Sequence, residues 1–266
     1  MIEVKATGVH AGYGARPVLQ GVDLQIPAGR VSVVVGANGC GKSTLLRCLA
    51  RLHPLSRGSI RLGTTALDAL PARTLAQQLA FLPQSPQAPV GLSVEALVAF
   101  GRHPYRGLFG RWSAADRDAV LRALQETDLS DFAQRPLEEL SGGQRQRAWL
   151  AMTLAQQTPL LLLDEPASML DPGHQLELLA LIRRLADAGR TIVMVLHDLT
   201  AARHADQLIA LDQGRLAACG TPRDVLTPAL LHRLYGIDSH VLQAPDGSPV
   251  VVPLRATSLS ETRSTP

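Results

Sequence analysis

The sequence predicts an α/β fold in which a parallel sheet brings three polar segments to one edge. Each segment follows a short apolar run: 31–35 precedes a glycine-rich loop, 160–163 two carboxylates, and 191–196 a histidine and an aspartate. Continuous apolar runs of this length are typical of strands that are buried on both faces. Because ligands of open α/β sheets bind outside the carboxyl ends of the strands, these three ends predict one site.

The composition is that of one large globular domain, or of a core with an inserted subdomain. The chain has 266 residues, of which 46% are hydrophobic and 18% charged. A net charge of +3 with 3% aromatic residues argues against nucleic acid as a partner. We expect neither a transmembrane helix nor a signal peptide, because long apolar runs are missing and the first ten residues are charged. Three cysteines suggest reduced, cytosolic thiols.

Residues 36–43, Gly-Ala-Asn-Gly-Cys-Gly-Lys-Ser, match the phosphate-loop pattern between a strand and a helix. Glycines let successive N–H groups turn toward one anion, and the helix N-terminus adds positive potential. Lys42, one of two lysines among 26 basic residues, is expected to reach the β- and γ-phosphates, and the Ser43 hydroxyl to bind Mg²⁺. The predicted nucleotide-binding residues here are Gly36, Ala37, Asn38, Gly39, Cys40, Gly41, Lys42, Ser43 and Thr44.

Cys40 lies inside this loop, beside Lys42 and the start of the helix. Both neighbours lower the pKa of a thiol, so we expect alkylation of Cys40 to inactivate the protein and ATP to protect it. The alternative is that Cys40 is only a small residue that fits the loop.

The two other strand ends carry acid–base groups. Asp164 is expected to hold the Mg²⁺ shell and Glu165 to face an attacking water, while His197 contacts the γ-phosphate. By themselves Asp164 and Glu165 could be an ordinary strand exit. Their combination with the phosphate loop favours a catalytic site.

A second glycine pair opens another helix. Residues 140–147, Leu-Ser-Gly-Gly-Gln-Arg-Gln-Arg, precede a helical run to about residue 157, which makes a second anion-binding N-terminus. One triphosphate does not need two such sites in one chain. In a symmetric dimer, each copy's second site could close over its partner's nucleotide.

With these motifs in this order, the sequence resembles the ATP-binding subunit of an ABC transporter from Tyr13 to about Gly236. The resemblance implies a P-loop NTPase core, an N-terminal antiparallel β subdomain and an inserted α-helical subdomain at about 85–157. We expect one cassette over 1–240, followed by a hairpin and flexible tail over 241–266.

The resemblance also implies roles for individual residues. Tyr13 would stack on adenine, although it could instead be a packed surface aromatic. Gln84 would meet Mg²⁺ and sense the permease. Across the dimer, ATP would be contacted by Ser141, Gly142, Gly143 and Gln144, and Asp171 would lie in a loop that links the two sites. Asp164, Glu165 and His197 match the magnesium aspartate, the catalytic carboxylate and the switch histidine. Ala167 departs from the threonine that many relatives carry.

The segment 101–112 contains three arginines, three aromatic residues and no acid. Such a composition favours a protein interface, here a docking surface for the permease, but a solvated basic loop remains open. By resemblance, the segment is similar to that of importers for iron complexes and cobalamin, and residues 145–156 to the ferric-siderophore group. The resemblance implies a peripheral ATPase at the cytoplasmic face of the inner membrane, indirectly served by a substrate-binding protein.

The resemblance favours ferric-siderophore import over several other functions. Haem or cobalamin import would use the same chemistry. A soluble ABC ATPase acting on ribosomes or DNA usually has two fused cassettes or a coiled-coil insertion, and this chain has one cassette. A small-molecule kinase does not account for the Leu-Ser-Gly-Gly-Gln motif at 140–144, and a non-catalytic binding module does not account for Glu165 and His197.

Overall fold

The computed structural model describes residues 1–106, 110–168 and 170–256, and its centre is a six-stranded sheet in the order β10-β9-β3-β8-β7-β6. The strands are β3 (Val31–Val35), β6 (Leu79–Leu82), β7 (Leu160–Asp164), β8 (Thr191–Val195), β9 (Gln207–Asp212) and β10 (Arg215–Gly220). All are parallel except β10, which pairs antiparallel with β9. The carboxyl ends of β3, β8, β7 and β6 therefore lie side by side.

A second, four-stranded antiparallel sheet has the order β2-β1-β4-β5 and confirms the expected N-terminal β subdomain. Its strands are β1 (Val4–Tyr13), β2 (Arg16–Ile26), β4 (Arg57–Leu62) and β5 (Thr65–Ala66). Helix α1 (Lys42–Leu49) packs between the two sheets, with Leu45 and Leu49 fully buried in one apolar cluster. Burial of this helix fixes where the phosphate loop must end.

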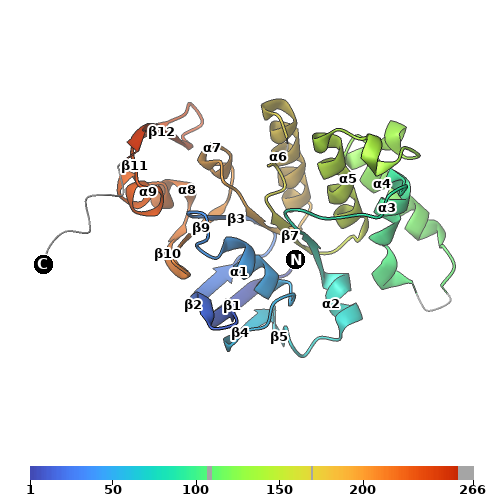
Figure 1. Cartoon of the computed structure of the whole chain (residues 1–266), viewed down its shortest axis with the longest axis horizontal. Helices are drawn as coiled ribbons and strands as arrows, with labels where there is room; N and C mark the ends of the chain where they lie inside the picture. Colours follow the sequence, from blue (N-terminus) through green and yellow to red (C-terminus); the bar gives the residue numbers. More distant parts are fainter. Residues whose placement is uncertain (107–109, 169, 257–266) are drawn as a thin grey trace, which may run out of the picture.

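Helices α3 (Val94–Phe100), α4 (Ala114–Glu126) and α5 (Gly142–Ala155) form the inserted subdomain, which lies to one side of the core in Figure 1. The short turns η1 (His103–Tyr105), η2 (Ser130–Phe132) and η3 (Leu137–Glu139) connect them, and α2 (Ala72–Gln78) precedes β6. Ser113 and Asp116 form a capping box at the start of α4. The start of each helix is therefore fixed by its own local sequence.

The segment 101–112 is anchored to the end of α5, and its residues 107–109 lie outside the described residues. The Arg102 guanidinium donates to Asp116 Oδ1 at 2.9 Å, in an ion pair that is buried on both sides. It also donates to the carbonyl oxygen of Ala155 at 2.8 Å. The hydroxyl of Tyr105 donates to the carbonyl oxygen of Gln156 at 2.8 Å. The start of this segment, at Arg102 and Tyr105, is thus held in place by polar contacts.

The remaining elements follow the order expected from the sequence. They are α6 (Pro172–Asp187), α7 (Leu199–Ala202), α8 (Pro222–Val225), α9 (Pro228–Tyr235) and a hairpin of β11 (Ile237–Gln243) and β12 (Pro249–Ala256). The hairpin starts at 237 rather than 241, and the predicted tail at 257–266 lies outside the described residues. Figure 1 places the C-terminal elements and the helical subdomain on opposite sides of the core. In the described ranges, no helix is long and apolar enough to cross a membrane.

Candidate functional site

The phosphate loop joins β3 to α1 and is shaped by its glycines. Gly36 has a φ of 144°, and a Cβ there would lie 2.3 Å from the carbonyl oxygen of Leu211, so a larger residue does not fit. Lys42 is 5% exposed, and its Nζ donates to the carbonyl oxygens of Gly36 at 2.8 Å and Ala37 at 3.0 Å. The lysine therefore lies along the loop.

Asp164, at the end of β7, is fully buried beside the start of α1. The Ser43 hydroxyl donates to its Oδ1 at 3.0 Å, while no described residue donates to the buried Oδ2. Burial raises the pKa of this carboxyl. A buried carboxylate oxygen without a donor or a cation is unfavourable. The Ser43 hydroxyl and the Asp164 carboxylate therefore fit a Mg²⁺ site.

The predicted Mg²⁺ site is not a protein-only cage. Among the described residues, no group of three or more His, Cys, Asp or Glu side chains could hold a metal ion. Mg²⁺ usually takes one or two protein ligands together with phosphate oxygens and water. Ser43 and Asp164, with Gln84 nearby in the same site, agree with that mode of binding.

Glu165 follows in a conformation that is uncommon for a residue other than glycine, with a φ of 55°. Its side chain is largely buried, and both carboxylate oxygens are engaged. The Gln84 side-chain amide donates to Oε2 at 2.7 Å, and His197 Nε2 is hydrogen-bonded to Oε1. The ends of β6, β7 and β8 thus meet at one carboxylate, and this meeting explains why Gln84 belongs to the site.

These strand ends open into a cleft of about 670 Å³. It is lined by Tyr13, Arg16, Val18, Asn38, Gly39, Gly41, Lys42, Ser43, Thr44, Gln84, Glu165 and His197. Arg16 and Val18 were not predicted, because neither belongs to a motif. Tyr13 is 47% exposed, its ring centroid lies 4.5 Å from that of His53, and Arg47 donates to its hydroxyl at 3.4 Å. The aromatic ring is therefore positioned beside the phosphate loop with a free face.

The glycine pair at 142–143 lies elsewhere. Ser141 caps α5, and its hydroxyl accepts the Gln144 amide at 3.2 Å, while the Gln144 side chain accepts the Ser141 amide at 3.0 Å. Asp171 caps α6 by accepting the His174 amide at 3.0 Å. None of Ser141–Gln144 or Asp171 is among the described residues that line the cleft. Within one chain, these residues and the phosphate loop do not meet.

The lowered pKa expected for the Cys40 thiol is wrong. Its thiol is buried, and this burial raises its pKa, which outweighs the opposing effect of Lys42. The helix start and Lys42 can be read from the sequence, but desolvation of the Cys40 thiol cannot. It depends on the packing of Gly36 and Leu211 around the loop. Cys40 fits the loop as a small apolar residue.

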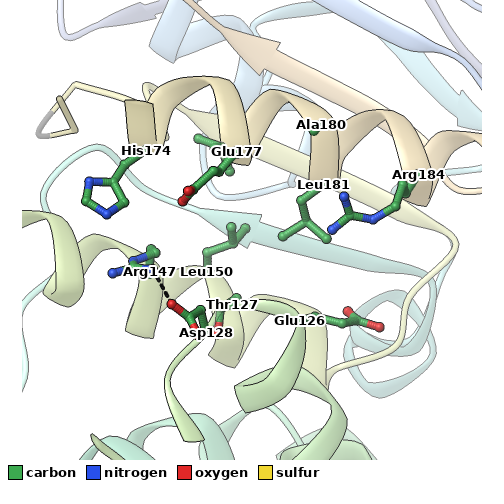
Figure 2. A pocket seen from close by; sticks show the side chains of 11 residues that line it. Glu126, Thr127, Asp128, Arg147, Leu150, His174, Glu177, Ala180, Leu181 and Arg184 are labelled. Atoms are coloured by element: carbon green, nitrogen blue, oxygen red, sulfur yellow. Dashed lines mark hydrogen bonds and ion pairs between the residues drawn. The ribbon is translucent and has the colours of Figure 1, made fainter. Parts of the chain in front are cut away.

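A second cavity of about 350 Å³ separates α6 from α4 and α5 (Figure 2). Figure 2 shows His174 and Glu177 on α6 facing Arg147 and Asp128, which form an ion pair at 3.5 Å. His174 Nδ1 lies 2.6 Å from Asp171 Oδ2. The cavity therefore borders both the helix that begins at Gly142 and the helix that Asp171 caps.

Comparison with known proteins adds a decisive observation. The profile of the ABC transporter family matches residues 19–168, which is more than half of the chain. The chain belongs to the ABC transporter family. The predicted P-loop cassette fold is confirmed, and the chain is an ATPase whose hydrolysis of ATP is coupled to transport.

Relatives of this ABC ATPase span nearly the same length. An iron(3+)-hydroxamate import ATP-binding protein of Bacillus subtilis is 45% identical over 88% of this chain and 88% of its own. A ferric enterobactin transport ATP-binding protein of Escherichia coli is 42% identical, covering 95% and 94%. A hemin import ATP-binding protein of Streptomyces coelicolor is 44% identical, covering 94% and 90%.

Solved structures agree on the architecture of this ABC ATPase. An ABC transporter in an inward-facing conformation superposes with a TM-score of 0.82 at 28% identity, over 96% of this chain and 98% of that one. A dimeric bacterial ABC transporter cassette gives 0.74 at 28% identity, over 83% and 99%. Permease subunits and a second cassette are accordingly partners of this type of chain.

Proposed function

We propose that this chain is the ATP-hydrolysing subunit that energises import of an iron complex, with a ferric siderophore as the cargo. The observation that carries the catalytic assignment is Glu165, whose two oxygens are held by Gln84 and His197 beside the phosphate loop. The cargo class rests on the relatives that import iron–siderophore complexes. The subunit would sit peripherally at the cytoplasmic face of the membrane, under its permease.

We assign each of these residues a separate role in phosphoryl transfer to water. Lys42, which now donates to the Gly36 and Ala37 carbonyl oxygens, would exchange them for phosphate oxygens. Mg²⁺ held by Ser43 and Asp164, with Gln84 beside them, would neutralise charge on the phosphates. Glu165 would orient and polarise the attacking water, because its carboxylate is already fixed from two sides. His197, at the rim of the site, would stabilise charge that develops on the γ-phosphate.

The site is completed by a second copy of the chain. Ser141, Gly142, Gly143 and Gln144 lie at the N-terminus of α5, whose amides and dipole favour an anion, yet they do not line their own cleft. In a two-fold dimer they would close over the partner's ATP while Asp171 links the two sites. Tyr13 would carry the adenine on its exposed face.

The dimer is tested with Glu165→Gln, which should bind ATP, hydrolyse it slowly and accumulate as a dimer. Hydrolysis and molar mass by light scattering are measured with and without Mg-ATP. Glu177→Gln is the matched control. It makes the same chemical change, but Glu177 lines the other cavity. A Glu165→Gln protein with wild-type turnover would overturn the assignment, and one that stays monomeric with ATP bound would overturn the dimer.

The segment that contains residues 101–106 and 110–112 is the proposed permease-docking surface. Phe100, which precedes the segment, and Trp112, at its end, expose apolar area, and the Arg106 guanidinium lies 5.1 Å from the centre of the Trp112 ring. Exposed aromatic and arginine side chains are enriched at protein interfaces. A substrate-binding protein would act on the other side of the permease and not touch this chain.

The cargo is tested by uptake of labelled ferric siderophore, haem and cobalamin in cells that carry wild type, Lys42→Ala or Lys5→Ala. Lys5 is the matched control, because it is the other lysine and lies exposed on β1. If cells that carry Lys42→Ala lose uptake of the siderophore but keep uptake of haem and cobalamin, the proposal is supported. Loss of haem or cobalamin uptake instead keeps the ATPase and changes its cargo. No loss of any uptake would favour a soluble, non-transport ATPase.

A further inference from the structure

The C-terminal part of the chain reaches the phosphate loop through a single side chain. The backbone amide of Gly36 donates to the hydroxyl of Tyr235 at 2.9 Å, although the two residues are 199 positions apart. Tyr235 is the last residue of α9. Burial raises the pKa of its hydroxyl to about 12, so the group stays neutral at physiological pH. The phenol oxygen of Tyr235 accepts the first amide of the loop.

Helix α9, which carries that hydroxyl, is anchored to the core of the protein. Leu231 and Leu234 are buried in the core, and the Arg233 guanidinium donates to Asp212 Oδ2, at the end of β9, at 2.9 Å. The turn after β9 also contacts the loop, since the Gly214 amide donates to the Cys40 carbonyl oxygen at 3.0 Å. The outer side of the phosphate loop is therefore supported by elements that follow it by more than 170 residues.

The same C-terminal unit, defined here as α9, β11 and β12 (residues 228–256), also contacts the helix that follows His197. Strand β12 contacts α7, and α7 begins two residues after His197. Val251 of β12 is packed against the main apolar cluster. One unit thus contacts both the phosphate loop and the helix that follows His197.

We propose that Tyr235 is a positioning residue for the phosphate loop, and that through it the C-terminal unit and bound nucleotide influence each other. The hydroxyl fixes Gly36, the residue at which β3 turns into the loop and at which no side chain fits. Without this acceptor, the loop relaxes in the free protein and must be reordered when ATP binds. By linkage, ATP that orders the loop also orders α9. The proposal rests on the assignment of residues 36–43 as the ATP site.

Tyr235→Phe removes only the hydroxyl, and Tyr105→Phe is its matched control. The Tyr105 hydroxyl also makes one backbone hydrogen bond, but in the helical subdomain and away from the cleft. Tyr105 lies in the proposed docking segment, so all measurements are made without the permease. Three quantities are measured on the full chain: amide exchange of the peptide containing Gly36 without nucleotide, the Kd and KM for ATP, and kcat. Exchange of residues 228–243 is compared with and without Mg-ATP.

For Tyr235→Phe we expect faster exchange of the Gly36 peptide and a Kd and KM raised about two- to tenfold, with kcat nearly unchanged. ATP should slow exchange in 228–243 in wild type and Tyr105→Phe, and much less in Tyr235→Phe. A Tyr235→Phe protein with wild-type loop exchange and Kd would overturn the proposal, as would uniform acceleration across the sheet with no selective change in KM. If wild type binds no ATP, the ATP-site assignment fails, and the nucleotide-free exchange still tests Tyr235.

Discussion

The side-chain amide of Gln84 donates to Oε2 of Glu165 at 2.7 Å, which ties the end of edge strand β6 to the end of β7. Since Glu165 follows β7 in a strained conformation, its carboxylate direction depends on such external contacts. His197 engages the other oxygen from the β8 side. Gln84 therefore positions the proposed catalytic carboxylate and is also a proposed Mg²⁺ neighbour.

Gln84→Ala should lower kcat about 10- to 100-fold, because misplacement of the water-orienting carboxylate by about 1 Å is enough for such a loss. The Mg²⁺ concentration for half-maximal activity should rise as well. Both quantities come from ATPase assays over a Mg²⁺ titration. Gln77→Ala is the control, since its amide contacts the Pro104 carbonyl oxygen outside the cleft. Equal activity of the two variants would contradict the role of Gln84.

Asp164→Asn should stabilise the nucleotide-free protein and abolish Mg²⁺-dependent hydrolysis. The folded-state pKa of Asp164 is raised by burial. At pH values between the pKa of Asp164 in the unfolded state and its raised pKa in the folded state, the folded state binds more protons than the unfolded state. The free energy of unfolding therefore decreases as pH rises through this window, and it stays lower above the window. Asparagine keeps an oxygen for the Ser43 hydroxyl and carries no charge, and a gain of about 2–5 °C in Tm is expected at neutral pH. Thermal unfolding without nucleotide at pH 7 checks this; an unchanged or lower Tm would contradict it.

Much of this site could be predicted from the sequence, because its parts are local. The phosphate loop, β7 and β8 each combine an apolar run with a polar end, and their parallel pairing then brings the ends together. The prediction missed β4 and α2, whose sequences lack a clear period. It also missed the contact of Tyr235 with Gly36, because a hydrogen bond across 199 residues leaves no local pattern.

Arg102→Met should destabilise the protein by about 3–5 kcal/mol, because it leaves Asp116 buried without its partner. The Ser113 hydroxyl, and then Arg102, hold the pKa of Asp116 below its usual range. A lowered folded-state pKa contributes stability above the unfolded pKa, and this stability is lost as pH falls through the folded pKa. Urea unfolding from pH 3 to 7 measures both effects. In Asp116→Asn, the free energy of unfolding should fall less steeply at acid pH. A fall as steep as in the wild type would argue against the Arg102–Asp116 pair as its cause.

Cys40 should react slowly with N-ethylmaleimide even without ATP, because the thiol is buried and its pKa is raised. Cys219, which is exposed, should be alkylated first. Mass spectrometry of digests over a time course, together with ATPase activity, distinguishes the two sites. Cys219→Ala should take up reagent slowly and stay active. Rapid modification of Cys40 that ATP blocks would restore the reactive-thiol expectation.

A cavity lies between α6 on one side and α4 and α5 on the other. The ion pair of Arg147 with Asp128 lies wholly on the side of the helical subdomain, and among the described residues no ion pair joins α6 to α4 or α5 across the cavity. A change of angle between α6 and the helical subdomain would therefore break no ion pair of these residues. The central sheet beside the nucleotide cleft is closely packed, and close-packed interiors deform little. We expect the cleft to keep its shape while this angle changes, so that ATP binding would move a partner that contacts the helical subdomain.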